Sequence, residues 1–335
     1  MSRYRRLDLL IVGDCNPDVV VVGGDVEPAF GQQEKLVDGI SLVIGGSASI
    51  MAVAAARLGL RVGLVAAMGA DAAGEFMLAR LAAEGVDASA VVIRPDLATA
   101  MTVVLSRDGD RAILTALGAM PTVTAADVRA ALAARPRHLH VSSYFLLERS
   151  LGPELAELFA AARSAGITTS LDTNWDPAQG WGGEQLRAVL AETDLLMPNE
   201  AEALKLGGVS GAGDVSDALR SLAAAGSRVV VKLGSQGAVA ADGASWYLAG
   251  LPAGLEGGFI DATGAGDCFT AGVVAGLLRG LDLAAALALG CAVGSASTRA
   301  AGGTGARTGL EVALALARSV PVSPVPLGGP LAGSR

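Results

Sequence analysis

The chain has 335 residues, of which 52% are hydrophobic, 17% charged and 4% aromatic. This length allows one large α/β domain or two ordinary ones, and the low aromatic content disfavours an aromatic-rich β-sandwich. A formal net charge of −8 disfavours a sequence-independent nucleic-acid binder, which needs a basic surface. The three cysteines, Cys15, Cys268 and Cys291, have no paired spacing and indicate reduced, buried thiols in a cytosolic protein.

The sequence contains no convincing signal peptide or membrane span. Basic residues at 1–6 precede an apolar run at 7–12, but Asp8 interrupts this run and it is too short for a signal sequence. A first buried strand explains it better. The longest apolar segment, 269–296, is broken by charged residues and glycines. We therefore expect a soluble cytoplasmic protein without membrane or nucleic-acid partners.

Short β-branched runs alternate with Ala- and Leu-rich helical stretches along most of the chain. The strands expected are 9–12, 62–66, 139–141, 168–171, 195–197 and 229–232. The helices expected are 48–58, 74–84, 125–134, 151–165, 183–191, 200–206 and 215–225. This alternation predicts a three-layer α/β/α sandwich whose central sheet is mostly parallel and covered on both faces.

Two stretches interrupt this alternation and predict a small β-lid beside the sheet. Residues 19–41 contain an extended run followed by Pro28 and glycines. Residues 91–114 alternate apolar and polar side chains around a hairpin turn at 107–110. We expect lid segments at about 15–43 and 91–115 within one domain at 1–318, followed by a Pro/Gly-rich tail at 319–335. An immobile edge hairpin is the alternative to a lid.

Candidate ligand-binding residues begin directly after the first strand. Asp14 and Asp18 lie at the carboxyl end of the sheet, where ligands of open α/β sheets gather. Either carboxylate could accept hydrogen bonds from substrate hydroxyls or could serve only as a turn or cap residue. Gly45 and Gly46 then open the helix expected at 48–58, and paired glycines let the backbone approach a ligand closely.

Further candidates follow the later strands. His138 and His140 are the only histidines, and because no third ligand has suitable spacing, they indicate ordinary buried histidines more than a metal site. Asp172 and Asn174 follow the strand at 168–171 and are candidates for the floor of a site. Lys232 ends a strand before a Gly-x-x-Gly turn, a common pattern that is a weak signal on its own.

Asn199 and Glu202 are three residues apart at a helix start, so their side chains share one side of the helix. An amide and a carboxylate placed there can order the waters around a magnesium ion. An N-cap with a capping-box glutamate explains the same local pattern nearly as well.

Residues 258–278 predict a glycine-rich turn leading into a long apolar helix. The backbone N–H groups from Gly264 to Asp267 would point out of the helix start, where they can hold an anion. A carboxylate in the same place suits a base that removes the proton from a hydroxyl attacking phosphorus. A glycine turn that merely caps a buried helix, with Asp267 favoured by the helix dipole, is the alternative.

The segment 261–267, Asp-Ala-Thr-Gly-Ala-Gly-Asp, resembles the C-terminal signature of the ribokinase-like (PfkB) family of carbohydrate and nucleoside kinases. Residues 45–59 resemble the N-terminal signature of that family. The resemblance covers residues 7–315 and implies transfer of the γ-phosphoryl group of ATP to a hydroxyl of a small sugar. A nucleoside kinase and a catalytically silent sugar-binding regulator are the alternatives. A dehydrogenase is disfavoured because no Gly-x-Gly-x-x-Gly follows the first strand.

The resemblance also implies roles for individual residues. It makes Asp267 the general base, with the anion hole at Gly264, Ala265 and Gly266, and it places the sugar hydroxyls on Asp18. It assigns Mg²⁺, through water, to Asn199 and Glu202, and the nucleotide to Lys232, Gly234 and Gly237. An optional K⁺ site is implied at Asp261, Thr263, Ser297, Ala300 and Gly302. The lid implies a homodimer, because exposed β edges tend to find a partner.

Two positions depart from the family pattern. Ile50 stands where many sugar kinases of the family have an asparagine that binds the sugar, and an apolar side chain cannot make that hydrogen bond. Asp176 stands where the family segment Asp-x-Asn-x-Arg has an arginine that meets the charge of acidic sugars. These departures argue against ribose itself and against a sugar acid, and they leave the acceptor unnamed.

Overall fold

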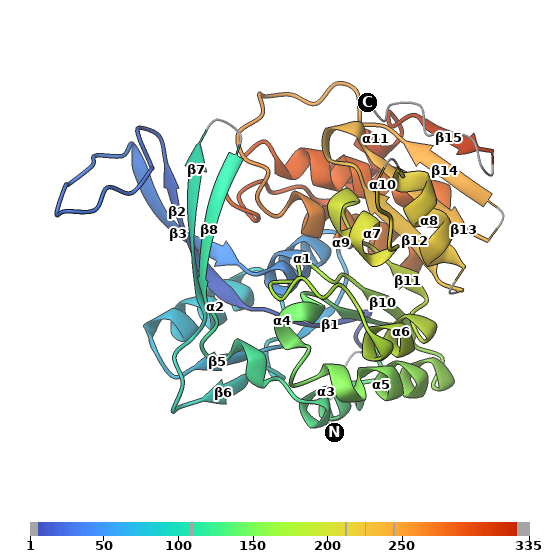
Figure 1. The fold of residues 1–335 in the computed structure, drawn as a ribbon, viewed down its shortest axis with the longest axis horizontal. Helices are drawn as coiled ribbons and strands as arrows, with labels where there is room; N and C mark the ends of the chain where they lie inside the picture. The colour runs from blue at the N-terminus through green and yellow to red at the C-terminus, as the bar shows by residue number, and fades with distance from the viewer. Residues whose placement is uncertain (1–5, 108–109, 212, 225, 244, 327–335) are drawn as a thin grey trace.

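The computed structural model describes residues 6–107, 110–211, 213–224, 226–243 and 245–326. Within these residues a nine-stranded sheet lies between two layers of helices (Figure 1). From edge to edge its strands are β15 (Val322–Val325), β14 (Ser245–Ala249), β13 (Ala238–Asp242), β12 (Arg228–Lys232), β11 (Leu195–Leu196), β10 (Thr168–Leu171), β9 (His138–Val141), β1 (Leu9–Val12) and β4 (Val62–Val65). The expected α/β/α architecture is confirmed.

Neighbouring strands run parallel from β4 to β12, and β13, β14 and β15 extend the sheet in antiparallel pairs. All six strands expected from the sequence are present, and they are the parallel ones. Because parallel strands end at the same edge, the loops that follow β1, β9, β10, β11 and β12 meet at that edge.

Alternation along each strand divides the core between the two helix layers. On β1, Leu9 and Ile11 belong to one hydrophobic core, and Leu10 and Val12 belong to the other. The first core is covered by α1 (Ser47–Arg57), α2 (Ala72–Ala83), α9 (Ala265–Leu278), α10 (Leu283–Ser297) and α11 (Leu310–Ala317). The second is covered by α3 (Ala125–Leu132), α4 (Tyr144–Leu147), α5 (Gly152–Ser164), α6 (Glu184–Ala191), α7 (Glu200–Leu206) and α8 (Val215–Ala223).

The apolar stretch at 269–296 forms parts of two separate helices, α9 and α10. Neither these nor any other helix in the described ranges is both long enough and apolar enough to cross a membrane. Two single 3₁₀ turns complete the helical elements described, η1 (Met120–Thr122) and η2 (Gly234–Gln236).

A small sheet projects from one side of the molecule (Figure 1). Its strands, in spatial order, are β3 (Gly39–Gly45), β2 (Asn16–Val22), β7 (Met101–Arg107) and β8 (Asp110–Ala116). They come from the two segments in which a lid was expected. The centre of the hairpin turn expected at 107–110, residues 108 and 109, lies outside the described residues. The start of the segment expected at 91–115 does not join this sheet, because β6 (Val92–Arg94) pairs with β5 (Ala67–Gly69) in a separate two-stranded sheet.

The main sheet extends into the stretch expected to be a tail. Strand β15 pairs antiparallel with β14, so that Val325 lies opposite Trp246. Pro324 obscured this strand in the sequence, but a proline is tolerated on an edge strand, where its missing N–H faces away from the sheet. Residues 327–335 of the expected tail lie outside the described residues.

Candidate active site

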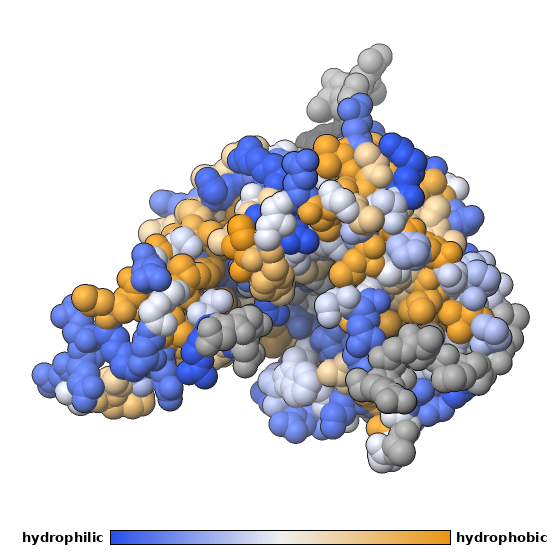
Figure 2. All heavy atoms as spheres, turned by 90° about the horizontal axis from the view of Figure 1, so that it is seen from above, coloured by the Kyte–Doolittle hydropathy of each residue, from blue (hydrophilic) through white to orange (hydrophobic). Residues whose placement is uncertain are grey.

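A cavity of about 550 Å³ opens at the carboxyl edge of the parallel strands. Viewed from above, a hollow separates the small sheet from the core (Figure 2). The cavity brings together eleven of the residues expected from the sequence: Asp172, Asn174, Asn199, Glu202, Lys232, Gly234, Gly237, Gly264, Ala265, Gly266 and Asp267. These residues come from the loop after β10, the end of β12 and the turn that follows it, and the starts of α7 and α9, which only the folded sheet places side by side.

The helix start that carries Asp267 has the geometry of an anion site. Gly264 is the N-cap of α9 with φ +70°, a conformation that favours glycine, and Asp267 is the third helical residue. A Cβ on Gly264 would also come within 2.6 Å of the Gly303 Cα. The Ala265 N–H donates to the Ala262 carbonyl (3.2 Å), but within the described chain nothing accepts from the N–H groups of Gly264, Gly266 or Asp267. Three of the four expected donors therefore remain for a ligand.

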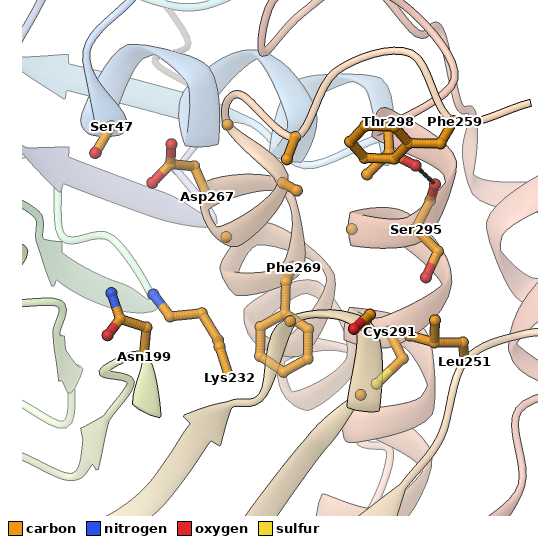
Figure 3. A pocket seen from close by; sticks show the side chains of 18 of the residues that line it. Ser47, Asn199, Lys232, Leu251, Phe259, Asp267, Phe269, Cys291, Ser295 and Thr298 are labelled. Carbon is orange, nitrogen blue, oxygen red and sulfur yellow. Dashed lines mark hydrogen bonds between the residues drawn. The ribbon is translucent and has the colours of Figure 1, made fainter. Parts of the chain in front are cut away.

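Burial raises the pKa of Asp267 to about 7. The negative charge of Asp172 raises this pKa further, whereas the charge of Lys232 and the hydroxyl of Ser47 lower it. Figure 3 shows the Asp267 carboxylate facing Ser47, with the Lys232 side chain below it, beside the start of α9. A carboxyl group with such a pKa can accept a proton near neutral pH.

Lys232 forms an ion pair inside this acidic cluster. Its Nζ lies 2.5 Å from Oδ2 of the buried Asp172. Burial opposes the positive charge, but the neighbouring carboxylates of Asp172, Glu202 and Asp267 outweigh that effect and raise the pKa of Lys232. The lysine side chain also lies close to Gly266, within van der Waals distance of a Cβ built there. Its charge therefore lies beside the anion site.

Asn199 and Glu202 form a capping box at the start of α7. The Glu202 carboxylate accepts from the Asn199 backbone N–H (2.9 Å) and from Nδ2 (2.6 Å), and Oδ1 of Asn199 accepts from the Glu202 N–H (2.9 Å). Burial and the charge of Asp172 raise the pKa of Glu202 to about 7. The capping alternative is thus realised by the same two side chains that line the cavity.

Asp14 caps α1 instead of lining the cavity. Its carboxylate accepts from the backbone N–H groups of Ser47 (2.8 Å) and Ala48 (3.0 Å), and from the Ser143 hydroxyl (2.9 Å). It thereby replaces the side-chain cap that Gly46 cannot supply. Asn174 joins this network, because its Nδ2 donates to the hydroxyls of Ser143 (3.1 Å) and Ser47 (3.3 Å).

Asp18 lies buried on β2, next to the glycine pair but outside the cavity lining. Burial raises its pKa to about 7, the charge of Asp14 adds to this, and a hydrogen bond from Asn16 Nδ2 (2.9 Å) opposes it. A Cβ on Gly45 would collide with the Asp18 carboxylate, and Gly46 has φ +78°. Both glycines are therefore required by the local packing and backbone geometry.

The residues of the expected cation site lie on two loops that touch. The carboxylate of Asp261 accepts from the N–H and hydroxyl of Thr263 (both 2.8 Å) and from the Gly302 N–H (2.8 Å). The hydroxyl of Ser297 donates instead to the Gly294 carbonyl of its own helix. Among the described residues there is no group of three or more His, Cys, Asp or Glu side chains that could hold a metal ion. A cation here would depend on carbonyl oxygens, including that of Ala300.

Several cavity residues were missed by the sequence analysis. Ser47 follows the glycine pair directly, and Arg111 reaches the cavity from β8, with Nη1 3.4 Å from the Thr263 hydroxyl. One end of the cavity is apolar and is lined by Leu251, Pro252, Leu255, Phe259 and Phe269, with Cys291 beside them (Figure 3). Sequence periodicity could not identify this end, because it is assembled from a loop and two helices far apart in the chain.

The two departures from the family pattern have structural roles. Ile50 is buried beneath the anion turn, where a Cβ on Gly264 would meet its side chain at 2.9 Å. Asp176 is buried in the loop after β10, and its carboxylate accepts from the N–H groups of Ala178 (2.8 Å) and Trp181 (2.7 Å). Neither side chain lines the cavity.

Comparisons with a family model and with known proteins point to the same family. The model of the pfkB family carbohydrate kinases matches residues 6–308. The chain is 29% identical over 281 residues to a ribokinase of Haemophilus influenzae, covering 80% of this chain and 85% of that protein. It is 26% identical over 271 residues to a cytidine kinase of Thermococcus kodakarensis, covering 80% and 88%.

The fold has counterparts among solved structures. A structure from E. coli in complex with ATP and Mg²⁺ has a TM-score of 0.78 and 24% identity, covering 93% of this chain and 99% of that one. At this level of identity the structural likeness shows the fold alone. Because the family model matches most of the sequence, the chain belongs to the PfkB family and is a kinase of the kind that phosphorylates sugars or nucleosides.

Proposed function

We propose that this kinase transfers the γ-phosphoryl group of ATP to a hydroxyl of a small sugar, with Asp267 as general base. One observation carries the proposal: Asp267, whose pKa burial raises to about 7, stands on a helix turn in which the N–H groups of Gly264, Gly266 and Asp267 have no acceptor among the described residues. The carboxylate takes the proton of the attacking hydroxyl. The N–H groups of Gly264, Gly266 and Asp267 stabilise the charge on the phosphoryl group, a contribution of about 3 kcal/mol for each well-placed donor.

The nucleotide end of the cavity has suitable donors for ATP. Lys232, Gly234 and Gly237 line it on one side, and the apolar residues described above offer a surface for a flat base. A divalent cation would bind mainly through the β- and γ-phosphates and neutralise their charge, because no group of three or more acidic side chains among the described residues could hold it directly. Both oxygens of Glu202 already accept from Asn199, so these residues would hold Mg²⁺ through water. A K⁺ ion, which the family resemblance implies, would bind between the loops of Asp261 and Gly302, which are joined by a hydrogen bond.

The acceptor binds between the start of α9 and the start of α1. Ser47 faces Asp267 there (Figure 3), and Asn174 donates to the same serine. Asp18 supplies a carboxylate for a pair of sugar hydroxyls, and Gly45 and Gly46 leave room for the sugar. Asp14 acts indirectly, because its oxygens hold the start of α1 in place.

The direct test is the substitution Asp267→Asn. It keeps the shape of the side chain but removes the base, so we expect kcat to fall by about 10²-fold or more while the melting temperature is maintained. Turnover of ATP is measured against a panel of sugars and nucleosides. Glu200→Gln is the matched control, since Glu200 is an exposed carboxylate in the first turn of α7. Retention of most activity by Asp267→Asn would refute the proposed mechanism.

A nucleoside acceptor is the second candidate, and an aromatic cluster favours it. Trp175 follows the cavity residue Asn174 and is 49% exposed. Its ring packs edge-on against Trp181 with centroids 4.8 Å apart, and Trp181 packs against Phe145 at 5.6 Å. In a chain that is only 4% aromatic, this cluster provides a rigid surface on which a base can stack.

The substitution Trp175→Ala separates the two acceptors. If a base stacks on this ring, we expect KM for nucleosides to rise about tenfold, since stacking contributes about 1–3 kcal/mol, while KM for ribose is unchanged. Trp175→Phe should restore most of the affinity. Equal effects on nucleosides and ribose, or no effect on either, would exclude the nucleobase platform.

We also propose that the small sheet acts as a lid and as the dimer interface. One of its faces carries apolar side chains directly opposite one another, among them Leu42, Val19, Val103 and Leu114. Leu42 is 46% exposed and Leu114 is 64% exposed. The opposite face carries Asp18 and Arg111 and is turned to the site. A second copy of the chain would bury the apolar face.

A further inference from the structure

Five polar side chains form a continuous ladder across β9 and β10 and the residue that follows β9; four of them are buried, and Thr168 at one end is exposed. His138 bridges Thr168 (Nδ1 to Oγ1, 2.7 Å) and Ser170 (Nε2 to Oγ, 2.6 Å). His140 bridges Ser170 (Nδ1 to Oγ, 2.7 Å) and Ser142 (Nε2 to Oγ, 2.9 Å). The proposed chemistry uses none of these groups. The ladder lies within the sheet face that is otherwise apolar and packs under α1 and α9.

The hydrogen bonds fix one consistent direction for the protons. The Thr168 hydroxyl donates to the Arg137 carbonyl (3.3 Å), so it accepts from Nδ1 of His138. The Ser170 hydroxyl then donates to His138 and accepts from Nδ1 of His140, and the Ser142 hydroxyl donates to His140. The Thr168 and Ser170 hydroxyls each donate and accept, the Ser142 hydroxyl donates, and both imidazoles are neutral.

Burial keeps the histidines in this neutral form. It lowers the pKa of His138 to about 4 and that of His140 well below its usual value. Both imidazoles therefore stay neutral, and the hydrogen bonds of the ladder keep their direction, across the neutral pH range. It ends on Ser142, which lies at the carboxyl edge of the sheet beneath Gly13.

The ladder meets the acceptor side of the site at a strained turn. Ser143, the residue after the end of the ladder, has φ +56°, a left-handed conformation that is uncommon for any residue but glycine. Its hydroxyl donates to Asp14 and accepts from Asn174, which itself has φ +57° and lines the cavity. A strained residue of this kind persists only where its surroundings hold it in place.

We propose that this histidine ladder positions the acceptor: by anchoring Ser142, it holds the left-handed Ser143 and, through Asp14 and Asn174, the floor on which the acceptor hydroxyl is presented. Ser170 and His140 are then positioning residues, because they touch neither substrate. The proposal rests on the function proposed above, and it concerns the binding of the acceptor and not the binding of ATP. Loss of the ladder should weaken the acceptor site and leave the nucleotide site intact.

The test is Ser170→Ala, which removes the central hydroxyl and leaves one nitrogen of each histidine without its partner. We expect KM for the acceptor to rise about tenfold, while KM for ATP changes less than about twofold and kcat less than about threefold. Ser170→Thr keeps the hydroxyl and should restore the acceptor KM. Ser216→Ala is the matched control, because Ser216 is buried and its hydroxyl has no partner among the described residues.

A crystal structure of Ser170→Ala provides a second readout that is independent of turnover. We expect the Ser143 hydroxyl to turn away from Asp14 in this variant. An acceptor KM that matches the wild-type value, or equal changes in both KM values, would overturn the proposal. If the wild type phosphorylates no acceptor, the proposed function fails, but an unmoved Ser143 in the crystal would still overturn the ladder proposal separately.

Discussion

At the scale of single residues, the site is organised by carboxylates that share one environment. Asp267 and Glu202 each have a pKa near 7, and in both cases burial is the largest cause and the charge of Asp172 adds to it. Lys232 pairs with Asp172 and offsets part of this charge. Burial therefore accounts for the largest part of the shift in the pKa of the proposed base, and the charges of its neighbours adjust it.

This coupling predicts the pH dependence of the reaction. A general base must be deprotonated, so kcat/KM should fall as the pH drops below about 7, the pKa of Asp267. Asp172→Asn removes a negative charge that raises this pKa, so the acidic limb should move to lower pH. The measurement is a pH profile of kcat/KM for the wild type and the variant.

Glu200→Gln again serves as the control and should keep the limb of the wild type. If the limb of Asp172→Asn coincides with that of the wild type, Asp267 does not titrate in the way described. Because the substitution also frees Lys232 from its ion pair, the maximal rate is expected to fall as well, but the position of the limb does not depend on that loss.

At the scale of elements, the active-site turn depends on how closely α9 approaches α10. A Cβ on Gly272 of α9 would lie 2.8 Å from the Leu289 carbonyl oxygen and 2.9 Å from the Gly290 Cα. A Cβ on Gly276 would likewise lie 3.0 Å from the Cα of Ala286. The two backbones are thus in direct contact, which fixes the axis of the helix whose first turn carries Asp267.

Gly272→Ala should push these helices apart. We expect a loss of about 1–3 kcal/mol in the free energy of unfolding, because the added methyl group has no room between two backbones. Chemical denaturation measures this loss. Gly258→Ala is the control, since a Cβ there has nothing within 4 Å, and it should leave stability unchanged. Equal stability of the two variants would show that the helix interface can relax.

Elements that strong local sequence patterns delimit were predicted correctly. An element that depends on pairing with another strand was missed. The bounds of β1, β10 and α7 agree with those expected, because apolar runs and turn residues delimit them. Strand β15 was missed, since its four residues acquire a strand conformation only by pairing with β14. For Asn199 and Glu202, the sequence permitted two explanations, and only the coordinates show that one capping box also borders the cavity.

At the scale of the whole molecule, the small sheet has two different faces. One carries the buried Asp18 and the cavity residue Arg111, and the other exposes the apolar rows that include Leu42 and Leu114. The sequence located the strands of this sheet, but Arg111 could not be recognised as a cavity residue, because its place depends on the approach of the sheet to Thr263.

Leu114→Lys tests the role of the apolar face. If a second copy of the chain covers this face, a charge on its exposed edge strand β8 should convert the dimer into a folded monomer. Light scattering coupled to size-exclusion chromatography measures the mass. Ile93→Lys, on β6 and 41% exposed, is the control and should stay dimeric. A wild-type monomer, or a dimer that survives Leu114→Lys, would exclude this interface.

The strand order of the main sheet has a consequence for biosynthesis. From β10 to β15, each strand lies beside the strand that precedes it in the chain. Because a chain emerges from the ribosome with its N-terminus first, every strand after β9 meets a neighbour that has already been made. Translation order and assembly order therefore coincide over this half of the sheet. The nascent protein can add strands one at a time, and its open edge moves along the sheet until β15 completes it.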